Sequence, residues 1–378
     1  MEKNKKEHKR TPIKSNVRNM LWLRAAGRCE FRGCNKRLWL DDLTKNPCNQ
    51  ANIAHIVSDS PDGPRGDAVR SPRLAQDISN LMLVCLDHHK LIDSKDRVPE
   101  YPEECLVKMK NDHEKRIEIL TNLKEEKAIH TVVYRSEIGS ASPQVDAYAI
   151  SQALLPNYYP ADNPIEIEWS GIRDSNLTKY WQDEERNLVC QYNERIKIPL
   201  ERWPNKKVAL FALAPMPLLV KLGSLLSDKV PVEVFQKHRD SESWTWSDEK
   251  SSDYIINPPE DDSKEPALVF SLSYDITDRV RRFYGAASSI WEFRINSPNN
   301  DFLKSRKQLA DFRKKVYDVL DEISSRTQKQ AIKVFMSMPV ACAVELGRVR
   351  MPKADLRLDL YDFNRHYSEK DEYALTIE

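Results

Sequence analysis

A sixteen-residue segment that occurs twice restricts the fold of this chain more than any other feature. Residues 208–223 (VALFALAPMPLLVKLG) align without gaps on residues 332–347 (IKVFMSMPVACAVELG), at a constant offset of 124. The identical pairs are Phe211/Phe335, Pro215/Pro339, Val220/Val344, Leu222/Leu346 and Gly223/Gly347. Any two strand–helix segments share an apolar pattern, but Pro and Gly in register favour a duplicated unit.

Each copy predicts a buried strand, a turn marked by proline, and a helix that ends at Leu-Gly. An alternating strand follows each copy, VPVEVF in the first and LRLDLY in the second. Strand–helix–strand units are typical of a parallel sheet covered by helices. The sequence therefore predicts an α/β domain with two related halves in the second part of the chain.

The first third of the chain is rich in cysteine and histidine. Five of the seven cysteines and five of the eight histidines lie before residue 124. In a reducing compartment such clustering indicates metal ligands rather than disulfides. Cys29-x4-Cys34 and Cys85-x2-His88 form two close pairs, which is the spacing of a tetrahedral zinc site. The alternative is that these cysteines are buried free thiols.

Several chemically active side chains lie between and beside these pairs. His55 stands on a predicted strand over residues 51–57, Asn80 precedes Cys85 by five residues, and His89 follows His88 directly. Asp93 lies one helical turn after His89, so that imidazole and carboxylate could share one cation.

This order resembles the HNH nucleases, whose ββα-metal motif is often stapled by zinc, over about residues 15–120. The resemblance implies that His55 is the general base and that His89 holds a catalytic Mg²⁺ or Mn²⁺ at the scissile phosphate. Asn80 would fix the loop or the hydrated ion. The implied ligands of the structural Zn²⁺ are Cys29, Cys34, Cys85 and His88.

The sequence departs from the HNH pattern beside the base. Many HNH nucleases carry Asp or Glu just before the base histidine, whereas this chain has Ala54. We therefore expect Asp93 to supply the second magnesium ligand. Arg65, in the GPRG turn, is predicted to contact a DNA phosphate, with a solvated loop arginine as the alternative.

Charge and composition divide the chain near residue 123. Residues 1–123 hold 23 Lys and Arg against 18 Asp and Glu, a balance of +5, whereas the remainder holds 36 against 40, a balance of −4. We expect an HNH domain over 1–123, a linker over 124–144 and a second domain over 145–378. The longest apolar run, 208–220, is broken by two prolines, and the charged N-terminus lacks an apolar stretch. We expect a cytoplasmic protein without a membrane partner.

The whole chain resembles the HNH–SAVED effector nucleases of bacterial CBASS anti-phage systems. SAVED domains look like two fused CARF-type, Rossmann-like units, which is what the duplication should leave. The expected fold is therefore α+β in the first domain and α/β in the second. The resemblance implies a cyclic di- or trinucleotide activator made by a partner nucleotidyltransferase, association into a homo-oligomer on activation, and degradation of double-stranded DNA.

Ligands of open α/β sheets bind beyond the carboxyl ends of the strands. Hydroxyl groups expected there belong to Ser271, Ser273, Tyr274 and Ser337. Trp169, Trp244 and Trp246 lie in loop-like segments suited to stacking on purines, with core packing as the alternative. Arg173 is a further candidate for a phosphate or a base edge.

Two rival functions remain at this stage. One is an HNH restriction-type endonuclease whose second domain reads DNA, which the balance of −4 after residue 123 disfavours. The other is a non-catalytic, zinc-stapled DNA-binding module, which has no need of His55, Asn80 and His89 together.

Overall fold

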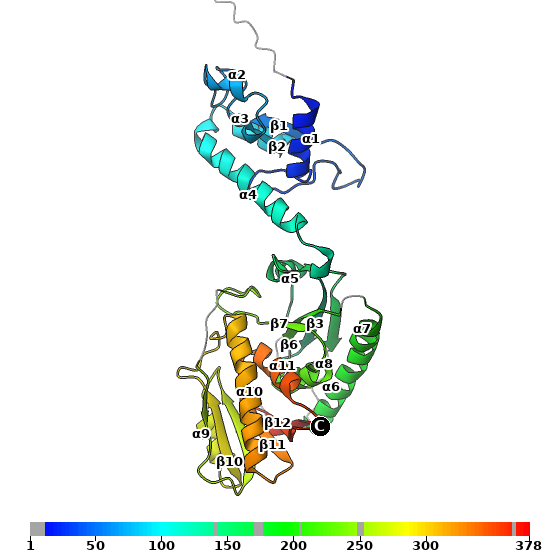
Figure 1. Cartoon of the computed structure of the whole chain (residues 1–378), viewed down its shortest axis with the longest axis vertical. Helices are drawn as coiled ribbons and strands as arrows, with labels where there is room; N and C mark the ends of the chain where they lie inside the picture. Colours follow the sequence, from blue (N-terminus) through cyan, green and yellow to red (C-terminus); the bar gives the residue numbers. More distant parts are fainter. Residues whose placement is uncertain (1–11, 139–142, 170–176, 204–205, 248–252, 365–367) are drawn as a thin grey trace, which may run out of the picture. The chain divides into compact units, whose positions relative to one another are not determined.

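The computed structural model describes residues 12–378 except 139–142, 170–176, 204–205, 248–252 and 365–367 (Figure 1). The chain divides into two compact units, Met1–Lys124 and Glu125–Glu378. Arg173 lies outside the described residues, and only the backbone of Trp169 is described.

The first unit is a two-stranded sheet surrounded by helices. Its elements are α1 (Ser15–Arg24), β1 (Ala51–His55), α2 (Arg70–Leu74), η1 (Ile78–Asn80), β2 (Leu81–Cys85), α3 (Leu86–Asp93), η2 (Val98–Glu100) and α4 (Glu103–Thr121). The predicted strand over residues 51–57 is thus confirmed, with a slightly earlier end.

The hairpin and the helix after it determine the geometry of the first unit. β1 and β2 are antiparallel, with His55 opposite Leu81 and Ala51 opposite Cys85. α3 follows β2 without a gap and packs on both strands. The elements therefore follow the order β–β–α. The residues of β2 (LMLVC) are all apolar, which is why the strand is buried completely between the elements around it.

α4 closes this unit through one face of its helix. Pro102 precedes the first turn, and Glu103 and Glu104 lie within it. Their carboxylates stabilise the helix because the N-terminal end of its dipole is positive. Leu106, Met109 and His113 recur at helical spacing and are buried. Nε2 of His113 lies 3.0 Å from the carbonyl oxygen of Ala25, so His113 is a packed residue.

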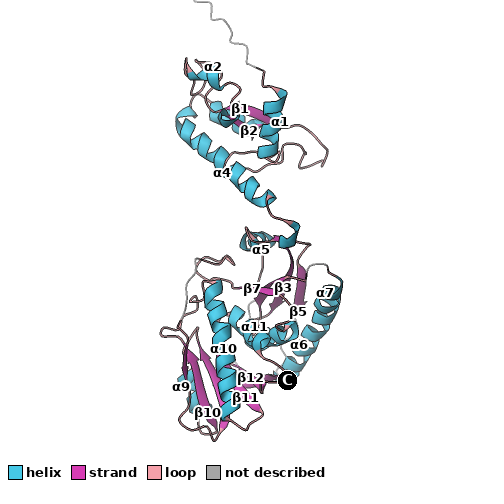
Figure 2. Cartoon of the chain, viewed as in Figure 1, coloured by secondary structure: helices cyan, strands magenta, loops and turns pink. Residues whose placement is uncertain are grey.

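The second unit contains two sheets (Figure 2). The first sheet has the order β4-β3-β6-β7, with β5 also paired to β3, and the second has the order β13-β12-β11-β9-β10-β8. The strands are β3 (Ala128–Ser136), β4 (Tyr159–Pro160), β5 (Ile165–Trp169), β6 (Val208–Leu213), β7 (Val232–Phe235), β8 (Ile255–Asn257), β9 (Glu265–Ser271), β10 (Ser288–Arg294), β11 (Ala331–Ser337), β12 (Arg357–Asp362) and β13 (Glu372–Ile377). The helical elements are η3 (Glu125–Lys127), α5 (Ala147–Leu154), α6 (Leu177–Tyr192), η4 (Asn193–Lys197), α7 (Ile198–Arg202), α8 (Met216–Leu226), α9 (Thr277–Tyr284), α10 (Arg306–Arg326) and α11 (Val340–Val349).

The duplicated segment forms the same unit in both sheets. β6, α8 and β7 make up the first copy, and β11, α11 and β12 make up the second. β6 pairs with β7 in parallel, and β11 pairs with β12 in parallel. The prediction of two parallel strand–helix–strand units is confirmed, and each copy belongs to a different sheet.

α8 and α11 cross at the two equivalent glycines. A Cβ added to Gly223 would lie 2.0 Å from the Val344 carbonyl oxygen, and one added to Gly347 would lie 1.9 Å from that of Val220. The contact is reciprocal, with the same residue types on both sides, as in an interface related by a two-fold axis. Only glycine permits so close an approach of two helix backbones.

Side-chain alternation along the strands places helices on both faces of each sheet. Val132 and Leu210 face the large core that includes α6, α8, α10 and α11, whereas Val133 and Phe211 face α5. In the second sheet Leu268 faces the same large core, whereas its neighbours face α9. Of these helices, α8 and α11 are buried along most of their length and lie in the middle of this core (Figure 1).

The expected linker over residues 124–144 is wrong in its central part. Residues 128–136 form β3, which is mostly buried and pairs with β4, β5 and β6. The charged and polar residues on either side of this segment predict a linker. The segment itself (AIHTVVY) is mostly apolar or β-branched, however, and such a run is enough for a strand that is covered on both faces. Among the described residues, no helix has the length and apolar character needed to span a membrane.

Candidate functional site

Four metal-ligating side chains of the first unit converge. The donor atoms of Cys29, Cys34, Cys85 and His88, hereafter the Cys/His cluster, all lie within 4.8 Å of one another. Sγ of Cys85 is 3.0 Å and Sγ of Cys29 is 3.7 Å from Nδ1 of His88. Gly33 has φ of 81°, a conformation that lets the chain turn between the first two cysteines.

The chemistry of the Cys/His cluster fits zinc. Tetrahedral bonds of about 2.3 Å place sulfur ligands about 3.8 Å apart, which is within the 4.8 Å that separates the donor atoms at most. Burial lowers the pKa of His88, which favours the neutral imidazole that binds metals. Burial also raises the pKa of the Cys29 thiol to about 12, and only a bound cation of high charge would favour its thiolate. Phe31 stacks on His88 at 4.0 Å between ring centroids and fixes the imidazole plane.

His55 ends β1 and is held in one orientation. Its Nε2 lies 3.1 Å from the carbonyl oxygen of Ala75. Because a carbonyl oxygen only accepts, Nε2 carries the proton in the neutral ring, whose lone pair is then on Nδ1. A histidine with one nitrogen anchored in this way can accept a proton at the other. The preceding residue, Ala54, is completely buried in the core of the unit.

Asn80 positions the chain that follows His55. Its side-chain oxygen accepts a hydrogen bond of 2.8 Å from the backbone amide of Val57. Its side-chain nitrogen donates to the carbonyl oxygens of Val57 at 2.9 Å and Leu74 at 3.3 Å. Of the two roles expected for Asn80, the structure therefore assigns the fixing of the loop.

His89 and Asp93 face each other on α3. Nε2 of His89 and Oδ2 of Asp93 are 3.7 Å apart, a separation that suits two ligands of one cation. The other carboxylate oxygen of Asp93 accepts a hydrogen bond of 2.9 Å from Arg65.

The expected contact of Arg65 with a DNA phosphate is not what the structure shows. Its guanidinium donates to the carbonyl oxygens of Ile56 at 2.6 Å and Ile92 at 2.8 Å, besides the bond to Asp93. The side chain is only 7% exposed. Arg65 therefore ties the loop after β1 to the end of α3, because buried carbonyl groups need donors that the loop itself lacks.

A cavity of about 580 Å³ lies at the carboxyl ends of the parallel strands of the second unit. Its lining follows β3, β6, β7, β9, β10, β11 and β12, and we call it the strand-end pocket. The lining residues are Ile138, Leu213, Ala214, Pro215, Met216, Gln236, Lys237, Arg239, Ser273, Asn300, Met338, Pro339, Val340, Asp362, Phe363 and Asn364. Both copies of the repeat contribute their Pro-marked turns, so the pocket belongs to the two sheets together.

The polar groups of the strand-end pocket include cations, amides and one carboxylate. Lys237 donates to the carbonyl oxygen of Glu242. Arg239 is exposed, and within the described part of the chain its guanidinium has no ion pair. The first turns of α8 and α11 also open on the pocket, which favours anions, although Gln236 already accepts from the amide of Ala341 at 3.2 Å.

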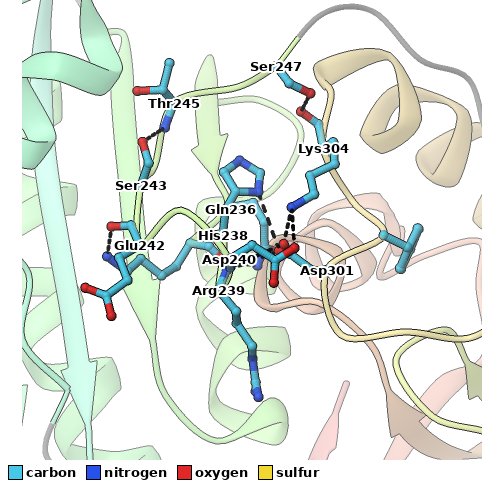
Figure 3. A network of polar contacts seen from close by, with 12 residues as sticks. Gln236, His238, Arg239, Asp240, Glu242, Ser243, Thr245, Ser247, Asp301 and Lys304 are labelled. Carbon is cyan, nitrogen blue, oxygen red and sulfur yellow. Dashed lines mark hydrogen bonds and ion pairs between the residues drawn. The ribbon is translucent and has the colours of Figure 1, made fainter.

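A network of polar contacts holds the backbone of Arg239 in place (Figure 3). Asp301 accepts hydrogen bonds from the backbone amides of Arg239, at 3.1 Å, and Asp240, at 3.4 Å, and it pairs with Lys304. Partial burial raises the pKa of Asp301, but these bonds more than offset it and lower the pKa to about 2. Figure 3 shows the guanidinium of Arg239 pointing away from this network.

Most of the sensor residues expected from the sequence do not line the pocket. Trp244 is only 1% exposed and packs against Phe211, so its expected stacking on a purine is wrong. Trp246 is half-buried against the same core. Apolar burial explains both, since a long loop between two sheets needs its own core residues.

The expected hydroxyl groups mainly hold the strand ends together. Ser271 is 1% exposed, and its hydroxyl group bonds Thr277 and the amide of Ile276. Ser337 accepts from the amide of Tyr274 at 2.9 Å, and the Tyr274 hydroxyl group pairs with Asn300. Ser273 is the one of these four that lines the pocket.

Several pocket residues were missed from the sequence. Arg239 and Asn300 line the pocket but follow their strands by several residues, and Phe363 lines it directly after the end of β12. The segment Lys237-His238-Arg239, directly after VPVEVFQ, was the available signal for Arg239. The long loop before Asn300 gave no comparable signal.

Residues 191–378 match the family described as "SMODS-associated and fused to various effectors sensor domain", abbreviated SAVED. The match begins in α6 and includes both copies of the repeat. A search of the curated proteins gave no match to the chain.

Cap4 receptors are among the solved structures to which the chain is similar. The Acinetobacter baumannii Cap4 SAVED/CARF-domain containing receptor with the cyclic trinucleotide 3′3′3′-cAAA is 10% identical, with a TM-score of 0.45 over 77% of this chain and 66% of that one. The Moraxella osloensis Cap4 SAVED/CARF-domain containing receptor is 9% identical, with a TM-score of 0.40 over 80% of this chain and 66% of that one. The chain thus spans slightly less than two thirds of either receptor.

Proposed function

Since residues 191–378 carry a SAVED sensor domain, we propose that this protein is an anti-phage effector in which a cyclic oligonucleotide, bound in the second unit, activates a metal-dependent DNA endonuclease in the first. The observation that carries the sensor half of the proposal is the strand-end pocket. Its volume lies within the roughly 300–1,000 Å³ range of small-molecule sites, and parallel strands of both sheets end there.

The groups at the strand-end pocket suit a nucleotide better than a simple anion. Arg239 can pair with a phosphodiester oxygen, because its guanidinium is exposed and its backbone is fixed by Asp301. Asp362 and the amides of Asn300 and Asn364 can bond the edges of bases, which carry both donors and acceptors. Apolar residues line the rest, including Met216 and Met338 from equivalent turns.

The nuclease half of the proposal is supported by the placement of three side chains. Nδ1 of His55 can accept the proton of an attacking water, while the bond from Nε2 to Ala75 keeps the ring oriented. Asn80 keeps the loop after β1 closed on the strand. His89 lies on α3, which packs against the strand that carries His55.

Two metals with different roles belong to this proposal. The Cys/His cluster would hold a structural Zn²⁺ that joins the segment after α1 to the end of β2. His89 and Asp93 would hold Mg²⁺ or Mn²⁺, which supplies positive charge at the scissile phosphate and the leaving oxygen. Arg65 restrains the carboxylate of Asp93 from the other side.

The direct test is cleavage of plasmid DNA by the full chain with magnesium, with and without a panel of cyclic di- and trinucleotides. We expect cleavage only when one of them is present. His55→Ala should reduce the rate by about 10²–10⁴-fold and leave ligand affinity unchanged. His113→Ala removes a packed histidine from the same unit and is the control for the effect of a histidine substitution on folding. It should reduce the rate of cleavage much less than His55→Ala. Cleavage by His55→Ala at the wild-type rate would refute the assignment of the base.

Activation by assembly completes the proposal. One HNH site cuts one strand, so a double-strand break needs two sites, and a homo-oligomer formed on ligand binding would supply them. Sedimentation with and without the activating nucleotide tests this point. If cleavage begins while the mass of the protein stays the same, activation takes place within one chain.

A further inference from the structure

One aromatic ring in the wall of the strand-end pocket is held from behind. Phe363 directly follows β12 and lines the pocket. The guanidinium of Arg279, on α9, lies over the Phe363 ring with Cζ 3.7 Å from the ring centroid. Arg279 itself is not among the residues that line the pocket. The ring therefore separates the guanidinium from the cavity.

The arginine is fixed by a buried carboxylate. Nε of Arg279 donates to one oxygen of Asp371 at 2.9 Å and a terminal nitrogen donates to the other at 3.0 Å. Asp371 is only 1% exposed, and its backbone carbonyl also accepts from Tyr284. A bidentate pair of this kind fixes the plane of the guanidinium and not only its charge.

Phe363 keeps an accessible surface despite this support. The residue is 38% exposed, and one face of its ring is covered by Arg279. Its exposed area therefore belongs to the opposite face and the edge. A flat apolar face that is preoriented at the wall of a cavity is the geometry on which nucleobases stack.

We propose that Phe363 is the stacking platform for a purine base of the bound nucleotide, with Arg279 and Asp371 as its positioning residues. This inference rests on the proposed sensor function and assigns one residue to recognition of the base. A purine is favoured because it offers the larger π surface. The cation behind Phe363 also draws electron density from the ring, which favours an electron-rich base on the free face.

The test measures binding to the full chain by calorimetry, with cyclic tri-adenylate, cyclic di-adenylate and cyclic di-guanylate as probes. For the probe that binds the wild type most tightly, Phe363→Leu should weaken binding by about 5- to 150-fold, which corresponds to the loss of one stacked base. Phe363→Trp should restore affinity to within about threefold. Its added tryptophan emission should be quenched by the probe.

A matched control distinguishes stacking from a general effect of removing a phenylalanine. Phe283 is 37% exposed and has the guanidinium of Arg282 5.2 Å from its ring centroid, but it does not line the pocket. Phe283→Leu should leave the affinity unchanged. If Phe363→Leu binds a probe as tightly as the wild type, the stacking site is refuted while the sensor function stands. If none of the three purine probes binds the wild type while another cyclic nucleotide of the wider panel activates cleavage, the purine site is refuted and the sensor function stands; if no cyclic nucleotide binds or activates, the proposed function fails and the stacking site fails with it.

Discussion

The crossing of α8 and α11 gives a prediction whose sign depends on tertiary structure. In an isolated helix, Gly→Ala is stabilising by about 1 kcal/mol, because alanine loses less conformational freedom on folding. At Gly223 the added methyl carbon would lie 2.0 Å from the carbonyl oxygen of Val344. Ordinary contact needs about 3.4 Å, so the two helices would have to separate by about 1.4 Å.

Such a separation is costly because both helices are packed on all sides. Overpacking of a core costs about 1–3 kcal/mol and occasionally more. The backbone carbonyl cannot rotate away as a side chain could, so we expect the upper end of that range. After subtraction of the gain in helix propensity, Gly223→Ala and Gly347→Ala should each lower the free energy of unfolding by about 2 kcal/mol.

Denaturation of the full chain by guanidinium, followed by tryptophan emission, measures this effect, since six of the eight tryptophans lie in the second unit. Ser325→Ala, on the exposed side of α10, is the control for helix propensity alone and should change stability by less than about 0.5 kcal/mol. The double glycine variant should lose less than the sum of the single losses, because the first alanine already separates the helices. A higher unfolding midpoint in either single variant would refute the close contact.

Three further predictions concern the Cys/His cluster, Arg65 and the loop beside the strand-end pocket. Cys85→Ser should lower the zinc content from about one ion per chain and unfold the first unit, as measured by metal analysis and proteolysis, whereas Cys48→Ser, outside the cluster, should not. Arg65→Lys should lower the stability of the first unit by about 2–4 kcal/mol, because it removes several buried hydrogen bonds. If stability is unchanged and the slope of log DNA affinity against log salt concentration falls by about one, the phosphate contact is supported instead. Burial lowers the pKa of His238, which faces Asp301, Lys304 and Lys237. Below pH 6.5 the unfolded state therefore binds a proton that the folded state does not, and stability should fall as pH falls. The unfolding midpoints at about pH 7.5 and about pH 5.5 should differ less in His238→Phe than in the wild type, and an equal difference would contradict this origin.

Local sequence determined the elements that depend on near neighbours in the chain. The duplicated segment specified two parallel strand–helix–strand units because apolar periodicity, a proline turn and a terminal glycine act within a few residues. The pairs Cys29/Cys34 and Cys85/His88 could be recognised for the same reason, since each pair lies in one short segment. Their convergence to within 4.8 Å is the point at which pattern and structure agree most closely.

Only tertiary structure decided which side chains line a cavity and which make their contacts inside the fold. Arg65 and Trp244 have polar or aromatic groups in loop-like sequence, yet one is bound to buried carbonyl groups and the other is in the core. Conversely, Phe363 carries no local signal and Arg239 only the basic residues around it, because the pocket they line forms where strands from two different sheets end. Contacts between residues more than 100 positions apart, such as Gly223 with Val344, depend on the packing of whole elements, which no short segment of sequence specifies.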